Sequence, residues 1–100
     1  STYIEVVQGH AEIRVVFSVS KRAKIAGCMV TDGRVARAAP VRVMRNGEVI
    51  HEGTISSLRH FKEEVNEMTQ GFECGIGLGN FTDFEEGDVL ATYRREKVSV

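Results

Sequence analysis

Histidines and cysteines are the side chains of this sequence that could most directly bind a metal ion or act as nucleophiles. They are scattered, without the C-x-x-C or H-x-x-x-H spacing that brings metal ligands together. The five residues are His10, Cys28, His51, His60 and Cys74. No metal site is therefore predicted, and the histidines are interpreted as surface residues.

Catalysis and nucleotide binding are not indicated either. The glycines of residues 75–79 lie in an alternating strand pattern and not before a helix, so they do not form a phosphate-binding loop. No serine lies in a strained elbow beside a candidate base. Glu63, Glu64 and Glu67 could share one side of a helix, where a solvated acidic face explains them better than acid–base chemistry. We predict that the chain is not an enzyme and needs no cofactor of its own.

Length and composition indicate one soluble domain. A chain of 100 residues should bury roughly two thirds of the surface that it exposes when unfolded. No segment is apolar enough to cross a bilayer, and residues 1–20 lack the features of a signal peptide, so neither a membrane span nor secretion is predicted. Cys28 and Cys74 are accordingly expected to be free, buried thiols in a reducing compartment.

The net charge of −1 hides an asymmetry along the chain. Residues 1–62 carry ten Lys or Arg and five Asp or Glu, a balance of +5, whereas residues 63–100 carry three and nine, a balance of −6. A basic patch that binds phosphate is therefore compatible with the near-neutral total.

Strands are the elements predicted to position these groups. Residues 11–19 alternate, which places five apolar side chains on one face of a long strand: Ala11, Ile13, Val15, Phe17 and Val19. A basic turn at residues 21–24 leads to a second apolar strand at residues 25–30, which a turn at residues 32–33 is expected to close. Gly27 inside this strand suggests a bulge or a close backbone approach.

The Asn46-Gly47 pair is the strongest turn signal in the chain. It separates two strand-like runs, and both turn residues of a type I′ hairpin need positive φ, which Asn and Gly tolerate. We predict a hairpin in which Arg45 lies opposite Glu48.

Three further runs, residues 53–58, 72–79 and 89–93, read as strands, the last preceded by a tight turn at residues 85–88. The polar connector of residues 59–70 contains the most helix-like stretch. Six or seven short strands with regular turns predict an all-β fold, a small antiparallel, Greek-key-like β-barrel.

Several segments resemble the C-terminal domain, called C2, of bacterial-type translation initiation factor two. Residues 25–33 (IAGCMVTDG) are similar to its Ile-Ala-Gly-Cys-x-Val-x-x-Gly motif, and further similar segments follow in the family's order: residues 41–47, 53–65, 71–76 and 80–90. The resemblance covers about residues 9–93, the expected core of a single domain spanning residues 1–100. It implies a barrel similar to domain II of the translational elongation GTPases, excised from a larger GTPase whose GTP and Mg site lies in a domain outside this chain.

The resemblance also implies a function. In that family the domain binds the formylmethionyl-CCA acceptor end of initiator tRNA and helps to deliver it to the small ribosomal subunit. The expected partners are formylmethionyl initiator tRNA and, through the parent protein, the ribosome. The domain itself is expected to be a monomer that contacts no membrane, in the bacterial cytoplasm or, alternatively, in an organellar matrix.

The site residues implied by the resemblance are Cys28, Arg59, His60, Phe61, Lys62, Glu73, Cys74 and Gly75. His60 stands where the family usually has Arg, and a largely neutral imidazole removes one interaction with phosphate. Arg59 and Lys62 can still supply charge, while Phe61 either stacks on a base or faces the core. Glu73 would have to bind a backbone N–H, a basic neighbour or the terminal ribose, because its charge repels phosphate.

Two interpretations of the cysteines stay open. Cys28 and Cys74 could line a dry pocket that accepts a thioether and a formylated, neutral amide but excludes a free ammonium group, or they could pack in the core. The function also has two rivals: a general single-stranded RNA-binding barrel, and an architectural barrel that only packs against other domains.

Overall fold

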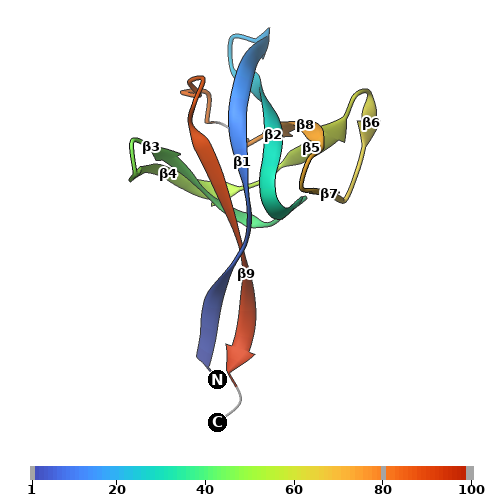
Figure 1. The fold of residues 1–100 in the computed structure, drawn as a ribbon. Coiled ribbons are helices and arrows are strands. Elements are labelled where there is room, and N and C mark those ends of the chain that lie inside the picture. Colours follow the sequence, from blue (N-terminus) through green and yellow to red (C-terminus); the bar gives the residue numbers. More distant parts are fainter. Residues whose placement is uncertain (1, 80, 99–100) are drawn as a thin grey trace.

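The structure is a computed structural model that describes residues 2–79 and 81–98. Over these ranges the regular elements are all strands (Figure 1). They are β1 (Thr2–Ser20), β2 (Ala23–Ala36), β3 (Pro40–Arg45), β4 (Glu48–Thr54), β5 (Ser57–His60), β6 (Glu63–Glu64), β7 (Glu67–Thr69), β8 (Glu73–Gly77) and β9 (Val89–Val98). A search of the described residues for a long apolar helix able to cross a membrane finds none.

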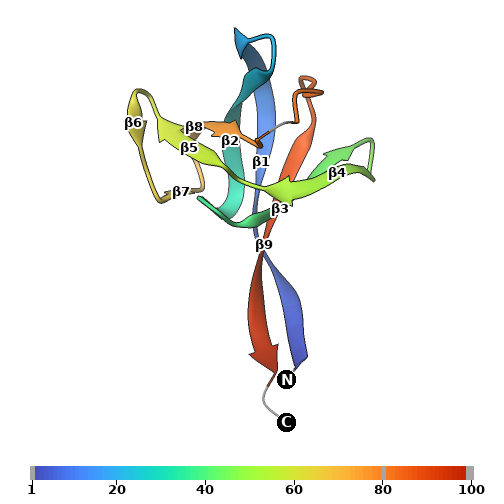
Figure 2. The same ribbon diagram turned by 180° about the vertical axis from the view of Figure 1, so that it is seen from behind.

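The strands form one antiparallel sheet in the order β4-β3-β9-β1-β2-β8-β5-β6, with β7 paired to β2. β4 and β5 lie near opposite ends of this order, yet they follow each other directly in the sequence. The two-residue link between them is held by backbone hydrogen bonds from Ala38 N to Ile55 O and from Ser56 N to Gly77 O, both 2.8 Å. The chain thereby curls the sheet into a small barrel, which confirms the predicted all-β fold (Figure 2).

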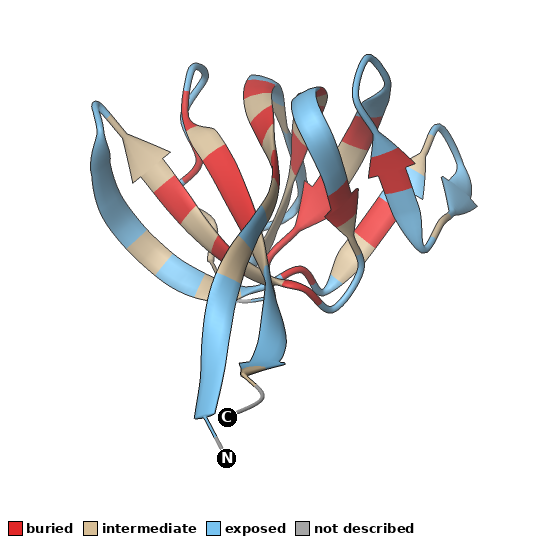
Figure 3. Cartoon of the chain, turned by 60° about the horizontal axis from the view of Figure 1, so that its bottom comes forward, coloured by how far each residue is buried: buried red, intermediate tan, exposed pale blue. Residues whose placement is uncertain are grey.

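Aliphatic side chains from nearly every strand fill the interior. The largest of those that are almost fully buried are Ile13, Ile55, Leu58, Ile76 and Leu90, with Val30, Val35, Val41 and Val43 beside them. Buried positions alternate with half-buried or exposed ones along the strands (Figure 3). The barrel is therefore stabilised mainly by apolar burial on the inner face of a pleated sheet.

The predicted β3–β4 hairpin is confirmed. Arg45 pairs with Glu48, and the two turn residues have positive φ, 54° at Asn46 and 80° at Gly47. The turn at residues 85–88 is also present, closed by Asp88 N donating to Glu85 O at 3.1 Å. Local turn chemistry thus determined these connections.

The prediction that residues 11–19 present one continuous apolar face is wrong. The register between β1 and β2 shifts between Ile13 and Val15, so that Arg14 is an extra residue. A one-residue bulge reverses the alternation beyond it, because the side-chain period of a strand is two. Ala11 and Ile13 are buried, whereas Val15 is 39% and Phe17 55% exposed.

The turn expected at residues 32–33 is not formed. β2 continues through Asp32 and Gly33 to Ala36, and the register to β1 shifts at this point. Gly33 has φ of +58°, and a Cβ there would collide with the Gln8 carbonyl oxygen. The glycine therefore permits a close approach to the backbone of β1 within a continuous strand and does not end the strand.

The helix-like connector of residues 59–70 is strand and turn instead. β6 pairs with β5, placing Glu64 opposite Arg59, and β7 pairs with β2. The hydrogen bonds between these strands outweigh a weak local helix preference, since an isolated short helix is marginal in water. Consequently Glu63, Glu64 and Glu67 do not share a helical side, and Arg59 lies in a strand.

Two ribbons extend from opposite ends of the barrel. The first residues of β1 pair with the last residues of β9, from Thr2 opposite Val98 to Val7 opposite Tyr93, and this ribbon carries both termini (Figure 1). At the other end, the turn between β1 and β2 projects beyond the barrel. Both strands of the terminal ribbon are longer than the sequence pattern predicted, because each completes the hydrogen bonds of the other.

Candidate functional site

The β1 bulge creates the wall of a pocket on the outer face of the sheet. It turns Val15 and Phe17 outward, beside Ile25, which lies opposite Phe17 on β2. The pocket has a volume of about 340 Å³. Its position is set by a backbone irregularity and not by a motif of polar residues.

Two glycines form the floor of this pocket. Gly27 of β2 and Gly75 of β8 are direct cross-strand partners. A methyl group on Gly27 would lie 2.6 Å from Val15 Cγ1 and 3.0 Å from Phe17 Cε2, and one on Gly75 would lie 3.0 Å from Ile25 Cγ2. The apolar walls therefore pack directly on bare backbone, which confirms the close approach expected at Gly27.

Phe61 supplies a second aromatic wall. It occupies the turn between β5 and β6 with a φ of 57°, and its side chain is 88% exposed. The alternative that Phe61 faces the core is wrong. An exposed ring held in a left-handed turn is available to stack on a ligand.

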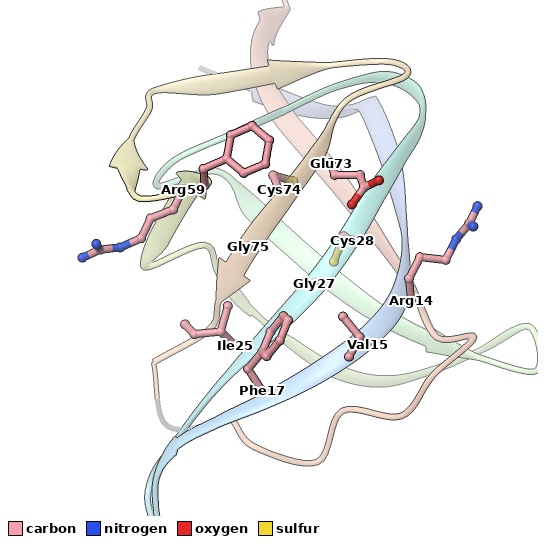
Figure 4. A pocket seen from close by; sticks show the side chains of 11 residues that line it. Arg14, Val15, Phe17, Ile25, Gly27, Cys28, Arg59, Glu73, Cys74 and Gly75 are labelled. Carbon is pink, nitrogen blue, oxygen red and sulfur yellow. The ribbon is translucent and has the colours of Figure 1, made fainter.

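Charged groups stand at the rim of the pocket. Arg14 and Arg59 lie on opposite sides of it, and Glu73 is the one carboxylate of the lining (Figure 4). Arg14 Nε lies 2.7 Å from Glu12 Oε1, and an Arg59 amino group donates to Glu64 at 3.4 Å. Among the described residues Glu73 has no side-chain ion pair or hydrogen bond. The pocket thus combines an apolar interior with cations at its edges.

Cys28 and Cys74 lie beneath this floor as opposed partners of β2 and β8. Their side chains belong to the core, with exposures of 2% and 5%, and both residues also border the pocket. Both are free thiols. Burial raises the pKa of Cys74 to about 11 and raises the pKa of Cys28 further, so both stay protonated at neutral pH.

His60 supports the pocket from the side. Its Nδ1 lies 2.9 Å from the backbone oxygen of Glu73, which can only accept, so this nitrogen carries the proton. The imidazole also contacts the ring of Phe61, with centroids 4.5 Å apart, and meets Phe72 edge-on at 6.1 Å. His60 therefore links the β5–β6 turn to β8, the strand that contributes Gly75 to the pocket floor.

Six of the eight residues singled out from the sequence line one pocket: Cys28, Arg59, Phe61, Glu73, Cys74 and Gly75. His60 is adjacent, and Lys62 is exposed in the same turn but does not line the pocket. Sequence reasoning missed the β1 residues Arg14, Val15 and Phe17. Their outward position depends on the bulge, and the sequence signals near it are Gly27 on the facing strand and Val16, an apolar residue that interrupts the alternation.

Comparisons with known proteins agree with this architecture. Residues 23–91 match the family model described as "Elongation factor Tu domain 2". Elongation factor SelB from Methanococcus maripaludis, solved with the GTP analogue GppNHp, superposes over 82% of this chain and 18% of its own with a TM-score of 0.68 and 17% identity. At that identity the likeness concerns the fold alone.

Curated relatives are considerably longer than this chain. Translation initiation factor IF-2 of Thermus thermophilus is 52% identical over 96 residues, which cover 96% of this chain and 17% of the relative. Translation initiation factor IF-2 of Caldanaerobacter subterraneus subsp. tengcongensis is 49% identical over 96 residues, which cover 14% of its length. The family match extends over most of the barrel, and the chain belongs to the elongation factor Tu domain 2 family.

Proposed function

We propose that this chain is the C-terminal domain of a bacterial-type translation initiation factor two and that its outer pocket binds the formylmethionyl-CCA end of initiator tRNA. One observation carries the proposal. Six of the residues that the family resemblance implies line the same pocket, which has an apolar interior and a cationic rim. Bacterial IF-2 proteins about half identical to this chain support the initiation context. The parent protein would supply the GTPase, with its GTP and Mg, and the contact with the ribosome in the cytoplasm.

The apolar interior favours a formylated amino group. Formylation replaces an ammonium group with a neutral amide, and a pocket walled by Val15, Phe17, Ile25 and Phe61 would impose a desolvation cost of several kcal/mol on an unpaired ammonium. Glu73 at the rim would accept hydrogen bonds from hydroxyls of the terminal ribose. The thioether of methionine is suited to aromatic walls, since sulfur contacts ring edges favourably.

The rim would hold the nucleic acid. Arg59 and Lys62 would bind phosphates, and the exposed ring of Phe61 would stack on an unpaired base of the CCA end. His60 would act indirectly, by keeping Phe61 and the Glu73 backbone in place. In this role an imidazole can replace the arginine usual in the family without a charge at this position.

The test is binding of a formylmethionyl-CCA fragment, an unformylated methionyl-CCA fragment and a deacylated CCA trinucleotide. We expect measurable affinity for the first and clearly weaker affinity for the others. Equal affinity for all three would favour the general single-stranded RNA-binding barrel, and binding of none would favour the architectural one.

The salt dependence of binding tests whether Arg59 and Lys62 contact phosphates. Replacing Arg59 and Lys62 with Gln should reduce the slope of log K against log salt by roughly 0.7 for each phosphate of the single strand that is no longer neutralised. Arg34, which lies near Glu67 on β7, provides a control substitution of the same type outside the pocket. An unchanged slope in the Arg59 and Lys62 variants would remove these residues from the interface.

A further inference from the structure

The turn between β1 and β2 carries a concentration of positive charge that the pocket does not use. Residues 15–31 contain three Lys or Arg and no Asp or Glu: Lys21, Arg22 and Lys24. Lys21 and Arg22 are exposed in the turn, and among the described residues neither they nor Lys24 take part in an ion pair. The positive charge at the tip of this hairpin is therefore not neutralised by an ion pair with any described carboxylate.

The basic tip is continuous with the pocket. Val15 and Phe17 of β1 line the pocket. β1 then continues to the tip through Val19, which is 68% exposed. Lys21 is four positions along the chain from Phe17, a span of about 13 Å in an extended strand. A stacked nucleic-acid strand rises about 3.4 Å per nucleotide, so the span matches roughly four nucleotides.

The nearby acidic loop does not neutralise the tip. Residues 81–88 contain four carboxylates, but Asp83, Glu85 and Asp88 all form ion pairs with Arg45. These three carboxylates are therefore paired with a residue of β3 and not with the tip. The tip remains the cationic end of the molecule next to the pocket.

We infer that Lys21 and Arg22 bind the phosphate backbone of the tRNA acceptor strand beyond its CCA end. The inference rests on the proposed function, since it places the terminal residue of the strand in the pocket. Cations without partners at the tip of a projecting hairpin are suited to binding phosphate, which depends on charge and position and not on base identity. The hairpin then acts as a second binding point that a short fragment cannot reach.

The experiment compares two ligands and two double variants. The ligands are formylmethionyl initiator tRNA and the formylmethionyl-CCA fragment. The test variant is Lys21→Gln with Arg22→Gln. The matched control is Arg95→Gln with Lys97→Gln, which removes the same charge from exposed positions on the terminal ribbon at the opposite end of the barrel.

For the tip variant we expect a salt slope for the whole tRNA that is lower by roughly 1.4 to 1.8, because each of two phosphates contributes about 0.7 to 0.9. Its affinity for the fragment should equal that of the wild type, which also shows that the variant is folded. The control variant should change neither ligand's binding. An unchanged tRNA slope in the tip variant, or an equal decrease in the control, would overturn the inference, whereas failure of the wild type to bind the fragment would instead overturn the proposed function.

Discussion

Gly27→Ala is the substitution that tests the pocket most directly. The added methyl would lie 2.6 Å from Val15 Cγ1, whereas ordinary van der Waals distances begin near 3.4 Å, so Val15 must move by about 0.8 Å. The Phe17 ring edge, at 3.0 Å, must move as well. Both side chains are partly exposed and can move outward, which shifts the wall into the space that the ligand would occupy.

The expected cost in stability is modest. Overpacking costs about 1 to 3 kcal/mol, and replacing Gly by Ala recovers about 0.4 to 1 kcal/mol through the unfolded chain. The net decrease of at most about 2 to 3 kcal/mol corresponds to a Tm decrease within roughly 20 °C for a domain of this size. Because the exposed side chains Val15 and Phe17 can partly relax, the loss of stability should lie near the lower end of this range.

Binding should respond more strongly than folding. We expect affinity for the formylmethionyl-CCA fragment to fall at least tenfold at temperatures where the variant is fully folded. Thermal unfolding followed by circular dichroism gives the stability, and titration of the fragment gives the affinity. Gly53→Ala is the control, because its methyl would contact only the side chain of His51 on β4, away from the pocket. A Gly27→Ala variant that binds the fragment like the wild type would refute the assignment of this pocket as the site.

Three further predictions concern the thiols, one ion pair and the ligand. Burial raises the pKa of Cys74 to about 11 and that of Cys28 further, so iodoacetamide at pH 8 should label both slowly in the native protein and quickly in denaturant; a disulfide between them would contradict this. Arg45 lowers the pKa of the Asp88 carboxyl by hydrogen bonding, so this carboxylate stabilises the fold above its unfolded pKa of about 3.9 and that stabilisation disappears as the pH falls through its lower folded pKa. Arg45→Gln should therefore lower the free energy of unfolding at pH 7 and lower it less at pH 2 to 3, as measured by urea titrations. An equal decrease at both pH values would be evidence against this role of the ion pair. Preference for formylated ligand should decrease, but persist, as the pH rises from about 6.5 to about 8.5, because the unformylated α-amino group becomes neutral near pH 8; a constant preference would rule out ammonium desolvation as its origin.

Local sequence chemistry was sufficient for part of this protein. Asn46 and Gly47 both tolerate positive φ, so the hairpin and its Arg45 to Glu48 register could be read directly. Alternating apolar residues likewise identified most strands and the all-β class. The resemblance to the family implied which residues of β2, β5 and β8 belong to one site, because the family's motifs are recognisable without coordinates.

The tertiary structure alone decided where the apolar faces point and how residues 59–70 are arranged. Every second residue of 11–19 is apolar in the sequence, yet the bulge at Arg14 leaves Ile13 buried and Phe17 exposed. The helix-like spacing of the acidic residues gave way to pairing of β6 with β5 and of β7 with β2. Both outcomes depend on hydrogen bonds between one strand and its partner strand, and the free energy of such pairing is not contained in either segment by itself.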